Sequence, residues 1–233
     1  MSEPVFVEIS TGPPTSSVMP FSTGMAHPPI GFDGPAAYSD EETAALAVEA
    51  STIISRYPQS ESALLPLLHL VQSHDGYLTR AGIMFCADQL QLTAATVAGV
   101  ATFYSMYRRE PTGEYLIGVC TNTLCAVMGG DAILSELTDS LGINPGDSTS
   151  DGRVTVERVE CNAACDFAPV VMVNWEFFDN QTPESVKQLV DDLRAGVPRT
   201  PSRGPETLCT FRQAARLLAG LPEIANSGEE AQP

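Results

Sequence analysis

The sequence has little positive charge and no long apolar stretch. Twelve lysines and arginines face 29 aspartates and glutamates among 233 residues, which leaves a net charge of −17. That charge argues against sites for nucleic acid and for anionic membrane surfaces. A membrane-spanning helix needs about 18 or more consecutive apolar residues, and the sequence contains no such run. We therefore expect no direct membrane span.

Two further signals are missing. The chain does not open on a basic segment followed by an apolar one, so we expect no export signal and a cytoplasmic location. It also shows no phosphate-binding glycine loop and no serine–histidine triad, so independent NADH catalysis is not expected. Six cysteines without an export signal indicate metal or redox chemistry rather than disulfides.

Four of the six cysteines form two closely spaced pairs. Cys120 and Cys125 have the spacing C-x4-C, and Cys161 and Cys165 have the spacing C-x3-C. Four thiolates are the number that a 2Fe–2S cluster needs. Zinc also takes four thiolates but usually from C-x2-C pairs, and a redox dithiol prefers C-x-x-C, which is absent. Spacing alone leaves a 2Fe–2S cluster, a zinc site and a disulfide or free thiols open.

The first part of the chain is expected to be an arm followed by helices. Residues 1–38 hold seven prolines and four glycines without periodic apolar residues, which predicts an extended arm, either disordered or laid along a partner. Residues 39–110 predict a four-helix bundle, with a capping box at Ser39 and caps at Thr79 and Thr93. Apolar residues at helical spacing mark these helices: Leu46, Ala50, Ile53, Ile54, Tyr57; Leu64, Leu67, Leu68, Val71; Ile83, Ala87, Leu90; Ala94, Val97, Ala101, Tyr104. Within them, His69 and Cys86 are expected to be buried structural residues.

Residues 111–196 predict a small domain of mixed helices and strands. Strands are expected at 115–120, 153–159, 169–173 and 175–178, and helices at about 129–140 and 182–194. The order β-α-β followed by β-β-α matches a thioredoxin-like α/β sandwich, so the fold class of the whole chain is α+β or α/β. Each cysteine pair follows a strand, so we expect the pairs to meet at one end of the sheet. Gly118 and Gly129 are expected to let backbone N–H groups approach the sulfurs.

The tail, residues 197–233, contains one possible short helix. Leu208, Phe211, Ala215 and Leu218 share one face, and we favour an anchor for a partner over packing against this chain. Cys209 lies in this segment, outside both cysteine pairs.

Several stretches together resemble a known family. These are Thr102–Tyr104, Val119–Cys125, Asp151–Arg153 and Val159–Cys165 with Ala168–Pro169. They resemble the thioredoxin-like 2Fe–2S protein, known as the E subunit, of the NADH dehydrogenase module of respiratory complex I (NADH:quinone oxidoreductase). The likeness extends from about Tyr57 to Arg194 and leaves out the arm and the tail.

The resemblance implies an electron-transfer role. Cys120, Cys125, Cys161 and Cys165 would ligate one 2Fe–2S cluster that exchanges single electrons with FMN. The neighbouring flavoprotein subunit, not this chain, would bind FMN and NADH, and a further peripheral-arm iron–sulfur subunit would be a second partner. The chain would have no catalytic residue of its own and would act on the cytoplasmic side, in the peripheral arm of a membrane-bound, proton-translocating complex. Alternatives are the equivalent diaphorase-module subunit of a soluble NAD-reducing hydrogenase or formate dehydrogenase, and a zinc-stabilised interaction module.

The sequence departs from the family pattern near the cysteines. Met128 stands where an arginine is frequent, and Asn162 and Ala163 stand where leucine and glycine are frequent. These changes are expected to alter hydrogen bonding and charge around a cluster, and so its reduction potential. Glu160 and Asp166 would lower that potential or act only as solvated carboxylates. Pro169, by resemblance to thioredoxin folds, is expected to follow a cis peptide bond.

Overall fold

The structure is a computed structural model that describes residues 31–222. The chain divides into the units Met1–Ile30 and Gly31–Pro233, and only the second contains described residues. Most of the predicted arm and the last part of the tail therefore lie outside the described residues. The end of the predicted arm is packed rather than extended into solvent. Phe32 is buried in the helical core, and the hydroxyl of Tyr38 donates to Asp75 at 2.7 Å.

The helices before the sheet begin where the sequence signals them. Ser39 and Glu42 form the predicted capping box, and the side chains of Thr79 and Thr93 accept the N–H groups of Gly82 and Thr96. Each cap satisfies a backbone donor that the first helical turn leaves unpaired. The elements are α1 (Asp40–Ile54), the 3₁₀ turn η1 (Ser60–Ala63), α2 (Leu64–Asp75), α3 (Arg80–Leu90) and α4 (Ala94–Phe103).

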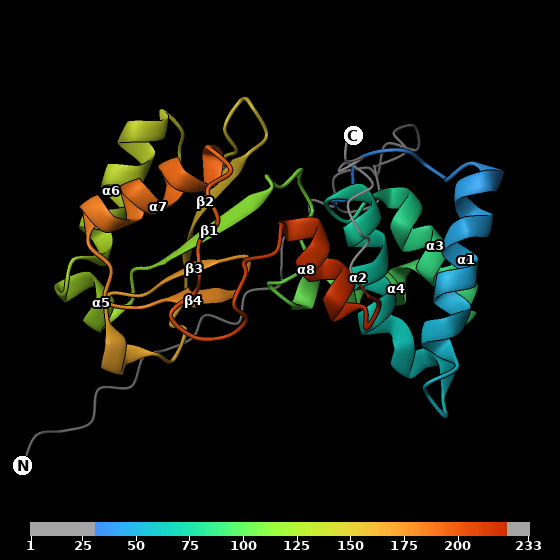
Figure 1. Ribbon diagram of the computed structural model, residues 1–233. Coiled ribbons are helices and arrows are strands. Elements are labelled where there is room, and N and C mark those ends of the chain that lie inside the picture. The colour runs from blue at the N-terminus through green and yellow to red at the C-terminus, as the bar shows by residue number, and fades with distance from the viewer. Residues whose placement is uncertain (1–30, 223–233) are drawn as a thin grey trace, which may run out of the picture. The chain divides into compact units, whose positions relative to one another are not determined.

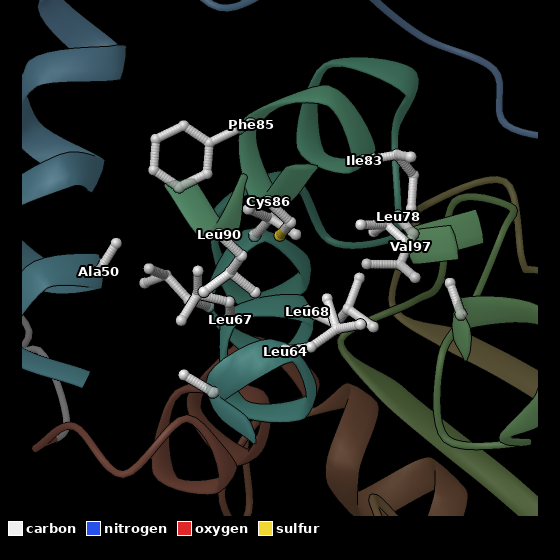
Figure 2. Packing of buried hydrophobic residues seen from close by; sticks show 14 of the residues in the cluster. Ala50, Leu64, Leu67, Leu68, Leu78, Ile83, Phe85, Cys86, Leu90 and Val97 are labelled. Atoms are coloured by element: carbon white, nitrogen blue, oxygen red, sulfur yellow. The ribbon is translucent and has the colours of Figure 1, made fainter. Parts of the chain in front are cut away.

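The four helices share one apolar core. Ala50 from α1, Leu67 from α2, Leu90 from α3 and Val97 from α4 are all buried in it, and Figure 2 shows side chains of this cluster turned toward one another. Cys86 on α3 is fully buried in the same core, which confirms its predicted structural role. Burial raises the pKa of its thiol, with a smaller contribution from Asp75, so Cys86 is an inert thiol.

His69 lies in the leucine row of α2, as predicted, but its buried polar atom is not satisfied. Its side chain is 8% exposed, and Nδ1 has no hydrogen-bond partner among the described residues. The ring contacts Tyr107 at a centroid distance of 4.8 Å. Burial lowers the pKa of His69 to about 4, because a charged imidazolium would lose its hydration there.

This lowered pKa predicts acid-sensitive stability. The folded chain keeps His69 neutral, whereas the unfolded chain binds a proton below its ordinary pKa of about 6.5. The contribution of His69 to the free energy of unfolding is therefore fully present above about pH 6.5 and is lost as the pH falls toward 4. We expect the free energy of unfolding to drop by about 2 kcal/mol more between pH 7 and pH 5 in the wild type than in His69→Leu. Urea denaturation at both pH values measures this difference, and equal drops would contradict the prediction.

The sheet has four strands in the order β2-β1-β3-β4. Strand β1 pairs in parallel with β2 and antiparallel with β3, and β3 pairs antiparallel with β4. The strands are β1 (Tyr115–Cys120), β2 (Val154–Val159), β3 (Val171–Val173) and β4 (Glu176–Phe178). Trp175, predicted to begin the last strand, lies instead in the turn before it, where Asn174 and Trp175 both have positive φ. The prediction of a mixed chain with a thioredoxin-like order of strands and helices is confirmed.

Two helices cover one face of this sheet, α6 (Gly130–Leu141) and α7 (Pro183–Arg194). Figure 1 shows them side by side over the strands. Alternate strand residues, such as Ile117, Val119 and Val156, pack with Leu137 and Leu189 in a second core. This packing holds the strand ends that carry the cysteines.

The tail helix α8 (Phe211–Leu218) packs back on the chain, so the preference for a partner anchor was wrong. It lies against α2, and its Phe211 and Ala215 are buried. Arg216 pairs with Glu49 of α1, with Nη2 and Oε1 2.5 Å apart. The apolar spacing of the tail indicated a buried face but not the surface that covers it.

No single helix among residues 31–222 combines the length and apolar character needed to cross a membrane. Taken together, α3 and α4 meet the length and composition test, although they are bent by 118° at the break between them.

Candidate metal centre

Parallel pairing brings the two cysteine pairs to one edge of the sheet. Cys120, the last residue of β1, is the register partner of Val159, the last residue of β2. Parallel strands end at the same edge, so the segment with Cys161 and Cys165 leaves the sheet beside Cys120. This is the juxtaposition predicted from the sequence.

Short helical elements hold the second cysteine of each pair. Cys125 lies in α5 (Thr123–Val127), and Cys165 begins the 3₁₀ turn η2 (Cys165–Phe167). The sequence predicts no helix at either cysteine, because neither element is long enough to show helical periodicity. The Ala168–Pro169 peptide bond that follows η2 is cis, as predicted.

The four thiols differ in exposure, and neighbouring thiols raise the pKa values of Cys125 and Cys165. Cys120 and Cys125 are buried, whereas Cys161 and Cys165 are exposed, with their Sγ atoms 3.9 Å apart. Burial and the nearby Cys120 raise the pKa of Cys125. A hydrogen bond with Cys161, followed by its charge, raises the pKa of Cys165. Cys120 and Cys125 pack in one buried cluster with Ala164, the residue before Cys165, so the two pairs lie at one site.

This donor set fits a 2Fe–2S cluster. Four thiols converge from two segments, and coordination to metal would deprotonate them. Backbone groups already bond the sulfurs: the N–H of Ala163 donates to Cys161 Sγ at 3.4 Å, and a backbone hydrogen bond from Val170 lowers the pKa of Cys125 in part. Among residues 31–222, no three His, Cys, Asp or Glu side chains are grouped as around a single ion.

Polar side chains that the sequence analysis did not assign tie the two segments together. Asn122 caps α5 through its side-chain oxygen and donates from Nδ2 to Glu160 at 3.3 Å. Arg158 donates to the hydroxyl of Thr121 at 2.8 Å and lies 3.5 Å from the carboxylate of Asp131. Glu160 is therefore a bonded carboxylate rather than a purely solvated one. An asparagine directly before a short helix is a capping signal that could have identified Asn122.

Gly130 makes the closest approach to the first cysteine pair. A Cβ atom there would clash with the carbonyl oxygen of Cys120 and lie 2.9 Å from that of Cys125. The two glycines named from the sequence act differently. A Cβ on Gly118 would meet Val159 at 2.9 Å, and Gly129 has open space but a φ of +116°. The prediction that Gly118 and Gly129 bring backbone close to the sulfurs was therefore wrong, because Gly118 makes room for the Val159 side chain and the close approach to the cysteine backbone is at Gly130.

Ala163 has a strained backbone. Its φ is +54°, in the left-handed region that favours glycine. This conformation orients the N–H of Ala163 toward Cys161. The strain is therefore located beside a candidate ligand.

Replacing Ala163 with glycine should stabilise the protein. Relief of the left-handed strain, less the added flexibility of the unfolded chain, is expected to raise the free energy of unfolding by about 0.5–1 kcal/mol. The matched control is Ala132→Gly on the exposed side of α6, which should lower it by about 1 kcal/mol. Chemical denaturation distinguishes the signs, and a loss of stability in both variants would refute the strain.

Exposed apolar side chains stand close to Cys125 and Cys165 in the chain. Leu124, Val127 and Met128 lie on or next to α5, and Phe167 lies in η2; Val127 is 79% exposed. Arg203 stacks over the ring of Phe167 at 5.3 Å. Exposed apolar side chains close to a candidate site are typical of a surface that takes part in protein contacts. We call these four residues the apolar rim.

The chain matches the family described as thioredoxin-like 2Fe-2S ferredoxin over residues 50–194. It is 59% identical over 221 residues to the E subunit of NADH-quinone oxidoreductase from Mycobacterium bovis, covering 95% of this chain and 83% of that protein. It is 37% identical over 142 residues to HndA, a subunit of the NADP-reducing hydrogenase of Solidesulfovibrio fructosivorans, covering 61% of this chain and 83% of that protein.

A solved structure shares the fold. The NAD+-reducing NiFe-hydrogenase in its air-oxidised state superposes with a TM-score of 0.52 at 24% identity. The match covers 58% of this chain and 23% of the hydrogenase chain.

Proposed function

This chain belongs to the thioredoxin-like 2Fe-2S ferredoxin family, and we propose that it is the electron-transferring E subunit of an NADH-quinone oxidoreductase. The observation that carries the proposal is the convergence of two cysteine pairs at the ends of β1 and β2. Cys120, Cys125, Cys161 and Cys165 hold the 2Fe–2S cluster, which supplies one-electron exchange.

The residues around the four cysteines determine how far water reaches the site and how negative charge on the sulfurs is stabilised. Cys120 and Cys125 are buried beside Ala164 and Val170, which keeps water from one side of the site. The N–H groups of Ala163 and Val170 are held against sulfur, where they stabilise negative charge. Cys161 and Cys165 lie at the surface, so the site has an edge that another redox group can approach.

The partner that we propose is the NADH-binding flavoprotein subunit, with FMN as the redox group nearest the cluster. The apolar rim supports docking at this edge, since burying Val127 and its neighbours removes apolar surface from water. We further propose that α1–α4 act as a four-helix bundle that joins the chain to the complex, beside a further iron–sulfur subunit. The complex would place the chain in its cytoplasmic-side peripheral arm.

One relative supports a second candidate assembly, a soluble hydrogenase or formate dehydrogenase. HndA, a subunit of an NADP-reducing hydrogenase, is 37% identical over 142 residues. The equivalent diaphorase-module subunit of a soluble hydrogenase or formate dehydrogenase would use the same cysteines in the same way.

Iron and acid-labile sulfide analysis with electron paramagnetic resonance (EPR) tests the cofactor. Anaerobically purified full chain should contain about two irons and two sulfides, and should give a spin-half signal only after reduction by dithionite. Stoichiometric zinc without such a signal, in protein not exposed to air or chelator, would refute the electron-transfer role and support a zinc-stabilised interaction module.

Reduction by NADH tests the partner. NADH should leave the isolated chain oxidised and should reduce its cluster only after the flavoprotein subunit of the same complex is added. Reduction of the isolated chain by NADH, or none with the flavoprotein present, would contradict the proposed division of roles.

A further inference from the structure

Part of the tail runs along β4, the strand at one edge of the sheet. Arg203 forms an isolated antiparallel bridge with Phe177 of this strand. The N–H of Ser202 donates to the carbonyl oxygen of Phe177 at 2.7 Å, and the hydroxyl of Ser202 accepts the N–H of Asp179 at 2.8 Å. The tail lies beyond residues 50–194, over which the chain matches its family, so the family match does not account for this contact.

The guanidinium of Arg203 contacts two aromatic rings. Its Cζ lies 4.3 Å from the ring centroid of Phe177 and 5.3 Å from that of Phe167. Its Nη2 donates to Oδ1 of Asp179 at 2.8 Å, and the side chain of Asp179 is only 11% exposed. A cation is attracted to the face of an aromatic ring, and the charge-assisted bond to a nearly buried carboxylate fixes the guanidinium in that position.

The two rings belong to different parts of the cysteine site. Phe167 is the last residue of η2, the 3₁₀ turn that Cys165 begins. Phe177 packs against the buried cluster that contains Cys120 and Cys125. The same guanidinium therefore joins the segment of the exposed cysteines to the packing around the buried cysteines.

The η2 turn has little packing of its own. It is three residues long, and none of the three is buried. The N–H of Asn180 donates to the carbonyl oxygen of Phe167 at 2.8 Å and attaches the end of the turn to the loop after β4. Segments with few buried contacts open easily, so the contact with Arg203 restrains the turn that carries Cys165.

A cluster of fixed geometry needs ligands that are held rigidly. We infer that Arg203 is a positioning residue, which acts through the ring of Phe167 to hold η2 so that Cys165 stays in place to bind the 2Fe–2S cluster. Residues that orient a metal ligand typically contribute about 10-fold to 100-fold to metal affinity. The inference rests on the proposed function, and it gives the tail a role in retaining the cluster.

The rate at which EDTA removes iron from the oxidised, cluster-loaded full chain tests this role. Arg203→Ala should lose iron about tenfold faster than the wild type. Arg203→Lys, which keeps a cation that can lie over the rings, should restore most of the wild-type rate. Arg199→Ala is the matched control, since Arg199 lies in the same part of the tail but pairs with Asp192 of α7 at 2.6 Å. Its loss should leave the rate of iron release unchanged.

Phe167→Leu tests the same contact from the other side, and it serves if Arg203→Ala does not fold. It removes the ring but keeps an apolar side chain, so iron release should again be about tenfold faster. A variant with both substitutions should be no faster than either single variant, because both remove one shared interaction. The EPR lines of the reduced cluster should also broaden in each single variant, since Cys165 would no longer be held in one orientation.

The outcomes separate the two proposals. A 2Fe–2S signal with the same rate of iron release in the wild type, Arg203→Ala and Phe167→Leu would overturn the inference and leave the proposed function intact. Equal acceleration by Arg203→Ala and Arg199→Ala, or a rate in Arg203→Lys as high as in Arg203→Ala, would overturn the inference in the same way. A wild-type protein without any 2Fe–2S signal would overturn both.

Discussion

Cys161→Ala should abolish the 2Fe–2S cluster, lowering the iron content by at least about tenfold and removing the EPR signal of the reduced protein. Cys161 is exposed and belongs to none of the three apolar cores. Truncating its side chain therefore costs little folding energy. Loss of the cluster in a variant that remains folded would then reflect loss of a ligand.

Cys86→Ala is the matched control for that variant. Cys86 lies in the helical core, so its loss should cost about 1 kcal/mol of stability through a small cavity while iron and sulfide stay at the wild-type level. Far-ultraviolet circular dichroism, iron analysis and EPR on both variants complete the comparison. A Cys161→Ala protein that retains its iron and its signal would rule out the assigned ligand set.

Gly130→Ala should strongly destabilise the protein although it leaves every cysteine in place. Its Cβ would clash with the carbonyl oxygen of Cys120 and would lie 2.9 Å and 3.1 Å from the carbonyl oxygen and carbon of Cys125. All three are backbone atoms, so no flexible side chain can move aside. We expect a loss of about 3 kcal/mol in the free energy of unfolding and a lower iron content, since both candidate ligands must shift.

Gly99→Ala provides the control for Gly130. Gly99 lies on the exposed side of α4, and an added Cβ would meet nothing within 4 Å. The same substitution there should stabilise the protein by about 0.5–1 kcal/mol, because alanine restricts the unfolded chain and favours helix. Chemical denaturation and iron analysis of both variants test the prediction; equal effects at the two positions would argue against crowding at the cysteine site.

Much of the fold could be predicted because local chemistry decides it. Capping side chains determined the starts of α1, α3, α4 and α7, and alternating apolar residues marked β2. The meeting of the two cysteine pairs followed from strands that end on them. These signals are properties of short segments, so they can be read without knowledge of the rest of the chain.

The features that could not be predicted depend on contacts between distant segments. Whether Gly129 or Gly130 crowds the ligands depends on where α6 begins relative to the end of β1. The left-handed φ of Ala163 arises from how the second cysteine segment turns over the site. The covered face of α8 depends on α2, which lies far earlier in the chain.

The packing of α8 against α2 has a consequence for biosynthesis. Leu221, close to the end of the described residues, belongs to the same apolar core as Leu46 of α1. During synthesis, the first helices leave the ribosome long before the segment that contains α8 and Leu221 has been made. The helical core is therefore completed only after the segments that carry all four candidate ligands have been synthesised. A chain cut short before Phe211 would expose α2, and quality-control proteases could recognise it before it joined an assembly.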